Sequence, residues 1–488
     1  MSLVQPVDNL AMLPAYLAAG TAVLVLLFDL LVARPAVTVA VAALGAAGTA
    51  AGAALVGAAG ERRTFCVGAD CSWVWGGRAA LVGAVIALLT LGVLALSGPL
   101  LRAGRTPVGE YCFLLACAMT GGVVLGAAGD LITLIVALET LTLPLYVLVG
   151  LRRGSLAGAE AAVTFFVVSV VATTVTLLGA ALLYAVAGTL HLDRLGATLA
   201  DRADLTDLPL TGVAAALVVA GLAFKVAAVP FHAWAPATYD GAPLPVAAYL
   251  STASKLGGVV ALLAVVQRAL PGDMTGPVLA ALAVLTMTVG NLVALRQRRT
   301  VRLLAWSSVA QAGYILAPLG ALALAAGRTG DARTAAYAAA VAYAIFFVLL
   351  ELAAFAAVVA LRPADGDGGT LADLRGAARR HPWVGGAFAL ALIGLAGLPP
   401  GLAGLFAKVT VVRALLAGHA GWLALVVALN AVIGLAYYLR VTASLYATPT
   451  GAAAVRPART VALALGVATV AAVVIGFAPQ LVLDVAAR

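Results

Sequence analysis

The sequence holds three lysines, and each lies in or beside a run of apolar residues. Lys225 and Lys255 fall within residues 221–258, and Lys408 follows a Gly-Leu-Pro-Pro-Gly stretch at 397–401. The other 26 of the 29 basic residues are arginine. A desolvated lysine can lose its proton near neutral pH, whereas arginine stays charged. A GC-rich genome also favours arginine. All three lysines nevertheless lie in or beside apolar runs, and this pattern predicts proton-transfer chemistry there.

Two carboxylates lie in equally apolar runs, Glu139 within LITLIVALETLTLPLYVLVG and Glu351 within AIFFVLLELAAF. A charge at the centre of a bilayer costs at least about 2.5–3.5 kcal/mol on insertion scales, so Glu139 needs a partner or a proton. We expect Lys225 to be that partner, because a close Glu–Lys pair keeps the lysine charged and separation releases its proton. A static ion pair, or a carboxylate that reaches an interface, is the alternative.

The two other lysines have weaker local signals. Lys255 is flanked by Ser251, Thr252 and Ser254, whose hydroxyls either hydrogen-bond an ammonium or serve helix packing. For Lys408, a side chain that extends to the membrane interface is a stronger alternative than for the other two lysines, because a shorter apolar stretch separates it from Arg413.

His232 is a further candidate proton relay, because it follows Pro230 by two residues and histidine titrates near neutral pH; a hydrogen bond at a hinge is the alternative. The four cysteines and four histidines show no spacing typical of a zinc or iron–sulfur site. The sequence also shows no phosphate-binding loop or nucleophile triad. We therefore expect no cofactor and no metal in this chain.

The composition predicts a polytopic membrane protein. Hydrophobic residues make up 64% of the 488 residues and charged residues 10%, with a mean hydropathy of +1.11. Soluble domains are about one half apolar and one quarter charged. The formal net charge of +9 comes from arginines scattered through short loops, which excludes the long basic face of a nucleic-acid-binding protein.

The apolar runs predict an all-α fold with about fourteen transmembrane helices, since each span needs roughly 20 apolar residues and the runs lack the alternation of a barrel. The spans are expected near 10–33, 36–58, 78–100, 110–128, 131–151, 158–188, 211–234, 243–266, 275–295, 302–325, 334–361, 384–416, 421–446 and 459–483.

The seventh and twelfth spans are expected to be discontinuous, because prolines interrupt them beside Lys225 and Lys408. Broken helices five spans apart suggest two inverted five-helix repeats. This divides the chain into helices 1–3 (1–105), a first repeat of helices 4–8 (106–268), a second repeat of helices 9–13 (269–446) and a last helix (447–488).

The arginines also predict an orientation. Placing both termini outside the cytoplasm puts sixteen of the twenty-six arginines in inner loops and ten in outer loops, as the positive-inside rule favours. Cys66 and Cys71 then face the oxidising side, where they either form a disulfide or stay as two free thiols.

Four stretches resemble the antiporter-like membrane subunits of respiratory complex I, a family related to the subunits of Mrp antiporters: FKVAAVPFHAWAPATYDGAPLPVAAYLSTASK, DLITLIVALETLTLPLYVLVGLRR, VRLLAWSSVAQAGYIL and LAGLPPGLAGLFAK. The likeness extends over about residues 105–445. Within the family, the chain length and the YDGAPLP stretch resemble subunit N most.

This resemblance implies roles for four residues: Glu139 and Lys225 as the coupled pair, Lys255 as the central relay and Lys408 as the lysine of the second half-channel. It implies a proton-translocating, non-redox subunit of NADH:quinone oxidoreductase, a translocase of the bacterial cell membrane. NADH, FMN, iron–sulfur clusters and quinone would belong to partner subunits. The implied partners are an antiporter-like neighbour and small subunits of the membrane arm, in the lipid bilayer and without nucleic acid.

Three positions depart from the family pattern. Thr164 stands where a sixth-helix lysine is common, Ala237 where an aspartate is usual, and Gln311 where a histidine is frequent. Two other functions stay open from the sequence: a subunit of a Mrp-type secondary cation/proton antiporter, and a membrane scaffold with static charges.

Overall fold

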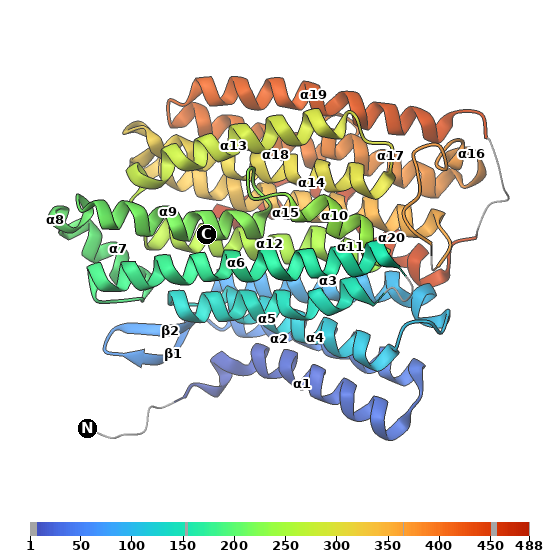
Figure 1. Ribbon diagram of the computed structural model, residues 1–488, viewed down its shortest axis with the longest axis horizontal. Coiled ribbons are helices and arrows are strands. Elements are labelled where there is room, and N and C mark those ends of the chain that lie inside the picture. The colour runs from blue at the N-terminus through green and yellow to red at the C-terminus, as the bar shows by residue number, and fades with distance from the viewer. Residues whose placement is uncertain (1–6, 152–154, 365, 450–455, 488) are drawn as a thin grey trace.

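The computed structural model describes residues 7–151, 155–364, 366–449 and 456–487. Its long helices lie side by side in one bundle (Figure 1). Twelve helices of the described residues are long and apolar enough to cross a membrane. They are α1 (Asn9–Val32), α2 (Pro35–Ala58), α3 (Gly77–Arg102), α4 (Val108–Gly126), α5 (Leu131–Gly150), α6 (Leu156–Ala187), α9 (Pro209–Val226), α11 to α12 (Leu244–Arg268), α13 (Gly272–Ala294), α15 (Gly330–Leu361), α19 (Gly421–Tyr446) and α20 (Arg459–Phe477).

Two of the fourteen predicted spans, 302–325 and 384–416, correspond to shorter helices. α14 (Thr300–Leu316) has 17 residues and continues as the 3-10 helix η2 (Ala317–Ala323). α17 (Pro382–Ala396) and α18 (Leu402–Ala417) have 15 and 16 residues. Length and composition thus identify twelve spans, and the count of fourteen stays a prediction. Three arginines of the orientation count, Arg152, Arg153 and Arg488, lie outside the described residues.

Both predicted helix breaks are present. α9 ends at Val226, Ala227 has a left-handed φ of 60°, and the chain resumes as α10 (Trp234–Gly241). α17 ends at Ala396, Gly397 has a φ of 82°, and α18 begins at Leu402. The prolines explain both breaks, because proline donates no backbone hydrogen bond and clashes with the preceding turn.

A third interruption was not predicted. Between α11 (Leu244–Tyr249) and α12 (Lys255–Arg268) the backbone forms the π-helical segment η1 (Leu250–Ser254). π-helical turns inside α-helices occur frequently at functional sites. Lys255 directly follows this one.

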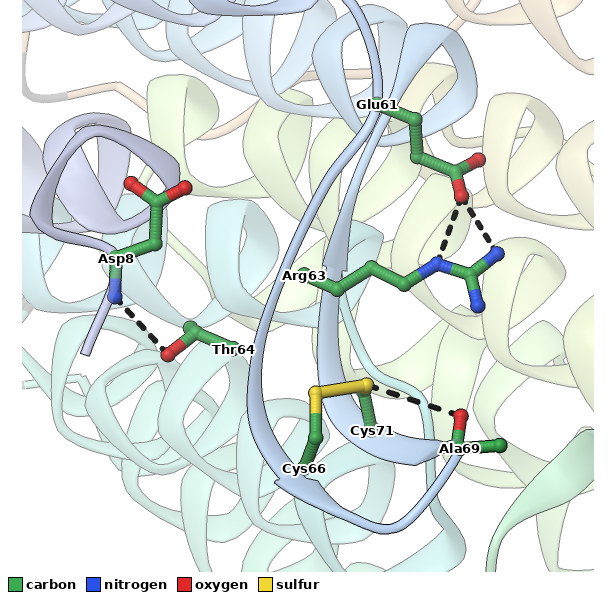
Figure 2. Close-up of a disulfide and its surroundings, with 7 residues drawn as sticks. All are labelled: Asp8, Glu61, Arg63, Thr64, Cys66, Ala69 and Cys71. Carbon is green, nitrogen blue, oxygen red and sulfur yellow. Dashed lines mark hydrogen bonds and ion pairs between the residues drawn. A yellow bond between two sulfur atoms is a disulfide. The ribbon is translucent and has the colours of Figure 1, made fainter. Parts of the chain in front are cut away.

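A two-stranded hairpin departs from the all-helical prediction. β1 (Arg62–Val67) pairs antiparallel with β2 (Asp70–Trp75), and a disulfide joins Cys66 to Cys71 across the pair (Figure 2). The composition indicated only a polar loop here, because six-residue strands in a connection leave little periodic signal.

The hairpin is fastened to the start of α1. The Asp8 backbone N–H donates to Thr64 Oγ1 at 3.2 Å (Figure 2), and Arg62 forms an ion pair with the Asp8 carboxylate at 3.1 Å. Trp73 Nε1 donates to the Ala11 carbonyl at 3.0 Å. The hairpin therefore fixes the start of α1.

Short helices cover the ends of the bundle. They are α7 (Leu192–Asp201), α8 (Ala203–Thr206), η3 (Ala326–Arg328), α16 (Ala377–Arg380) and α21 (Gln480–Ala487). In Figure 1 α7, α8 and the hairpin lie at one end and α16 at the other. Arg268 binds both Asp193 carboxylate oxygens at 2.7 Å, which joins α7 to the end of α12. These hydrogen bonds lower the pKa of Asp193 below its usual value, although partial burial opposes them.

Two glycines let the site helices approach closely. A Cβ on Gly121 of α4 would lie 2.2 Å from the Leu141 nitrogen of α5, and one on Gly258 of α12 would lie 2.8 Å from the Lys225 carbonyl of α9. A larger residue at either position would push apart the helices that carry Glu139, Lys225 and Lys255.

Candidate functional site

Lys225 and Glu139 form an ion pair in the first half of the bundle. Lys225 Nζ lies 2.7 Å from Glu139 Oε1, and the lysine is 8% exposed. The same ammonium donates to Ser169 Oγ at 2.9 Å and to Thr142 Oγ1 at 3.3 Å. Lys225 lies in the last turn of α9, so the break directly after it leaves the side chain facing α5 and α6.

Hydroxyl groups complete the surroundings of Glu139. Thr173 of α6 donates a short hydrogen bond to Glu139 Oε1, and the Tyr146 hydroxyl lies 3.5 Å from Oε2 and donates to Ser169. A buried ion pair is tolerated only where such further hydrogen bonds offset its lost hydration. Ser169 and Thr173 were missed from the sequence. Their spacing of four residues on one helix face was the available signal.

Lys255 is held by α14. It is 1% exposed, and its ammonium donates to both the carbonyl and the hydroxyl oxygen of Ser308 at 2.7 Å. Ser251 and Thr252, considered from the sequence as partners of the lysine, donate instead to the Ala248 carbonyl of their own helix. Ser308 was missed from the sequence, because it lies 53 residues from Lys255 along the chain.

Lys408 is held by the end of α17. Its ammonium donates to the carbonyls of Leu395, at 3.3 Å, and of Ala396, and lies 5.0 Å from the ring centroid of Tyr314. In a continuous helix these carbonyls would accept from residues 399 and 400. Because both are proline, the carbonyls stay open, and their position at a helix C-terminus favours a cation. The ammonium thus points into the bundle instead of extending to an interface.

A chain of buried hydrogen bonds connects the surroundings of Lys255 and Lys408. Gln311 Nε2 donates to the Leu395 carbonyl and to the Tyr438 hydroxyl, both at 3.0 Å, and the Tyr438 hydroxyl also hydrogen-bonds Ser307. Ser307 precedes Ser308, which holds Lys255, and the Leu395 carbonyl also accepts from Lys408. Gln311, where the family often has histidine, therefore occupies the middle of this connection.

The remaining two candidates lie apart from these hydrogen bonds. Glu351 of α15 is fully buried, and within the described residues neither carboxylate oxygen has a hydrogen-bond partner. The His232 ring lies in the first helix break, 5.1 Å from the Trp306 ring, and its Nδ1 has no partner among the described residues. The relay role of His232 stays a prediction.

A polar cavity of about 820 Å³ opens between the ends of α3, α6, α10 and α14. Its lining includes Thr164 and Asp240, and Arg299 binds the Asp240 carboxylate at 2.7 Å and that of Asp367 at 3.0 Å. Thr164 precedes Ser169, the hydroxyl beside Lys225, by five residues on α6. The cavity therefore approaches the ion pair from the end of the bundle that the arginine count places inside.

Within the described ranges, no group of three or more histidine, cysteine, aspartate or glutamate side chains is arranged to hold a metal ion. The expectation of a chain without metal or cofactor stays a prediction.

Known proteins define the class of this fold and site. The family model described as NADH:quinone oxidoreductase/Mrp antiporter, TM, matches residues 128–434. Subunit N of NADH-quinone oxidoreductase from Salinispora tropica is 77% identical over the whole of both chains. A chain of respiratory complex I from Thermus thermophilus matches with a TM-score of 0.79 and 31% identity, over 97% of this chain and 99% of that one. A chain of a Mrp complex from a Dietzia species matches over 97% and 96%, with a TM-score of 0.80 and 23% identity, which shows the fold alone.

The chain therefore belongs to the family of NADH-quinone oxidoreductase subunit N. The sequence-based resemblance is confirmed, and the protein is a multi-pass membrane subunit.

Proposed function

We propose that the chain is a proton-translocating membrane-arm subunit of a bacterial NADH:quinone oxidoreductase, with the redox chemistry in partner subunits. The observation that carries the proposal is the Glu139–Lys225 ion pair, which is buried in the same bundle as Lys255 and Lys408. Two of these lysines are buried and Lys408 is partly buried. Lysines within a membrane are expensive and are expected where charge must move.

The first step is the loading of Lys225. Protons enter through the polar cavity, and Glu139 keeps the lysine charged while the ion pair is closed. Opening of the pair removes that stabilisation, so the lysine releases its proton toward Lys255. The close approach of Gly258 to the Lys225 backbone keeps α12 beside α9 during this step.

The second step is transfer to Lys408. Ser308, Ser307, Tyr438 and Gln311 provide hydroxyl and amide groups between the two lysines. Release then occurs on the outer side, beyond α18. Small movements of the side chains, or water between them, complete the path.

Several finer features belong to the same proposal. Both termini lie outside the cytoplasm, fourteen spans include two inverted repeats within 106–268 and 269–446, and this chain itself binds no cofactor. The partners are an antiporter-like neighbour and small membrane subunits, while NADH, FMN, iron–sulfur clusters and quinone belong elsewhere in the complex. The two broken helices, each with a lysine nearby, support the repeats.

A role as a Mrp-type antiporter subunit is less favoured, because 23% identity carries only the fold whereas a named complex I subunit is 77% identical. Purification separates the two functions. We expect hydrophilic redox subunits to copurify with the chain. Copurification with small antiporter subunits, and without redox subunits, would contradict the role in NADH:quinone oxidoreductase.

Replacement of Lys225 tests the proton step. K225A and E139A each leave one buried charge unpaired, at a cost of about 3–5 kcal/mol, so assembly must be measured first. K225R keeps the charge but cannot release its proton. In membrane vesicles we expect assembled K225R to lose at least about tenfold in NADH-driven proton pumping. The matched control is R63K, in the exposed ion pair with Glu61. Wild-type pumping by assembled K225R or K225A would refute the role.

A further inference from the structure

Glu351 is a buried carboxylate that the proton path described above does not use. It lies on α15, is 0% exposed, and neither Oε1 nor Oε2 has a hydrogen-bond partner in the part of the chain that the structure describes. Its neighbours along the helix, Leu350 and Leu352, are also buried. Buried polar groups are nearly always hydrogen-bonded, and buried charges are paired, so this carboxylate requires an explanation.

The position of Glu351 supplies a partner. Lys255 Nζ lies 5.9 Å from the ring centroid of Phe347, which is one helical turn before Glu351 on α15. Glu351 is close enough to interact electrostatically with Lys255, and also with the hydroxyls of Tyr239 and Tyr438. In the structure, however, the ammonium turns to Ser308 on α14.

We propose that Glu351 and Lys255 form a second proton-exchanging pair, which the structure shows open while the Glu139–Lys225 pair is closed. The proposal rests on the proposed function and adds a proton carrier to it. In the exchange, the O–H bond of the Glu351 acid breaks, its electron pair stays on the carboxylate, and the proton forms a new N–H bond on the neutral amine of Lys255. The two groups together keep their total charge.

Because Glu351 is buried, proton exchange between Glu351 and Lys255 requires the lysine head group to move. An isolated carboxylate in the interior loses its hydration, so ionised Glu351 is stable only when the ammonium is beside it. Lysine has a flexible four-carbon side chain, so its head group can leave Ser308 for the carboxylate. Lys255 would thus alternate between Glu351 on α15 and the Ser308 side, which leads through Gln311 to Lys408. It leaves Glu351 only as a new proton, released by Lys225, reaches the carboxylate.

Substitutions that keep the shape but remove the proton test the pair. E351Q cannot exchange a proton, and we expect assembled complex with E351Q to pump at least about tenfold more slowly than wild type. E351L removes the unpartnered polar group, so it should assemble and keep or raise the thermal stability of the complex, yet pump no better than E351Q. E351D, which retains a carboxyl, should recover part of the rate. E61Q, the same change at an exposed glutamate, should pump as wild type does.

Infrared difference spectra during NADH-driven turnover give a second readout. We expect a deuterium-sensitive band of a protonated carboxylic acid that shifts in E351D and disappears in E351Q. Because the band is assigned from wild type and E351D, the test holds even if E351Q and E351L fail to assemble. Wild-type pumping in E351L, or no change of the band in E351D, would overturn the proposal. If K225R abolishes pumping while E351L does not, only the second pair is wrong; if neither affects pumping, the proposed function itself fails.

Discussion

Each buried ammonium rests on a different kind of acceptor. Lys225 faces a carboxylate, Lys255 a serine carbonyl and hydroxyl, and Lys408 two carbonyls that prolines leave open. A full negative charge stabilises an ammonium more than neutral dipoles do. The first lysine is therefore the one whose charge depends most on whether its partner stays in place.

The Tyr438 hydroxyl offers a sharp test of the link between Lys255 and Lys408. Y438F removes the group that hydrogen-bonds Gln311 and Ser307, so we expect proton pumping to fall about tenfold at most. Stability should fall by about 1 kcal/mol per lost hydrogen bond. Pumping in vesicles and thermal unfolding of the purified complex measure the two effects.

Its neighbour Tyr437 is the matched control. It is equally buried, and its hydroxyl donates to Asn291 at 3.1 Å. Y437F should lose similar stability and keep its pumping rate. Equal pumping by Y437F and Y438F would mean that the tyrosine hydroxyl only supports packing.

At the scale of elements, the second helix break holds Lys408 through Gly397. A Cβ on Gly397 would meet the lysine side chain at 2.6 Å, and its φ of 82° is strained for any other residue. We expect G397A to cost about 1–2 kcal/mol of stability and to displace the ammonium from its carbonyls, which lowers pumping. Thermal unfolding and vesicle pumping measure both.

Gly386, on the same α17, provides the comparison. A Cβ there meets no atom within 4 Å, and its backbone is helical. G386A should therefore keep or slightly raise stability and leave pumping unchanged. If G397A behaves like G386A, the left-handed backbone at the break is not what positions Lys408.

The sequence predicted the elements better than their contacts. The length of the apolar runs identified most helices. The prolines beside Lys225 and Lys408 located both breaks, because a residue that lacks a backbone hydrogen-bond donor can be recognised from the sequence alone. The partner of Lys225 followed from charge alone, since Glu139 needs a compensating cation. Ser169 and Ser308 were missed, because a serine in an apolar helix is indistinguishable from a packing residue until the fold brings it to a lysine. The π-helical turn before Lys255 has no sequence signature.

At the scale of the whole molecule, the end of the bundle at which α7 lies is held by an ion pair that responds to pH. The pKa of Asp193 is lowered, so its pair with Arg268 is fully present above the unfolded value of about 3.9 and is lost as pH falls through the lower, folded value. In right-side-out vesicles we expect α7 to lose hydrogen-exchange protection, after correction for the intrinsic rate, when the medium falls below about pH 4.

The same pH experiment in inverted vesicles tests the orientation of the chain in the membrane. The proposed topology puts α7 outside the cytoplasm, so inverted vesicles would enclose it and acid in the medium should leave its protection unchanged. D193N should resemble the acidified protein already at neutral pH. Protection of α7 that responds to the medium only in inverted vesicles would reverse the assigned topology.

The three lysines also differ in how many hydrogen-bond acceptors their ammonium groups contact. An ammonium has three hydrogens. On Lys225 all three have acceptors, on Glu139, Thr142 and Ser169, whereas Lys255 and Lys408 each direct hydrogens to two acceptors among the described residues. Lys225 can therefore pass a proton on only after one of its hydrogen bonds opens, while Lys255 and Lys408 each keep one hydrogen without an acceptor in the part of the chain that the structure describes. The number of hydrogen-bond acceptors therefore makes Lys225 the lysine that holds its proton most firmly. Lys408, at the other end of the path, has a hydrogen that it can donate without breaking a hydrogen bond.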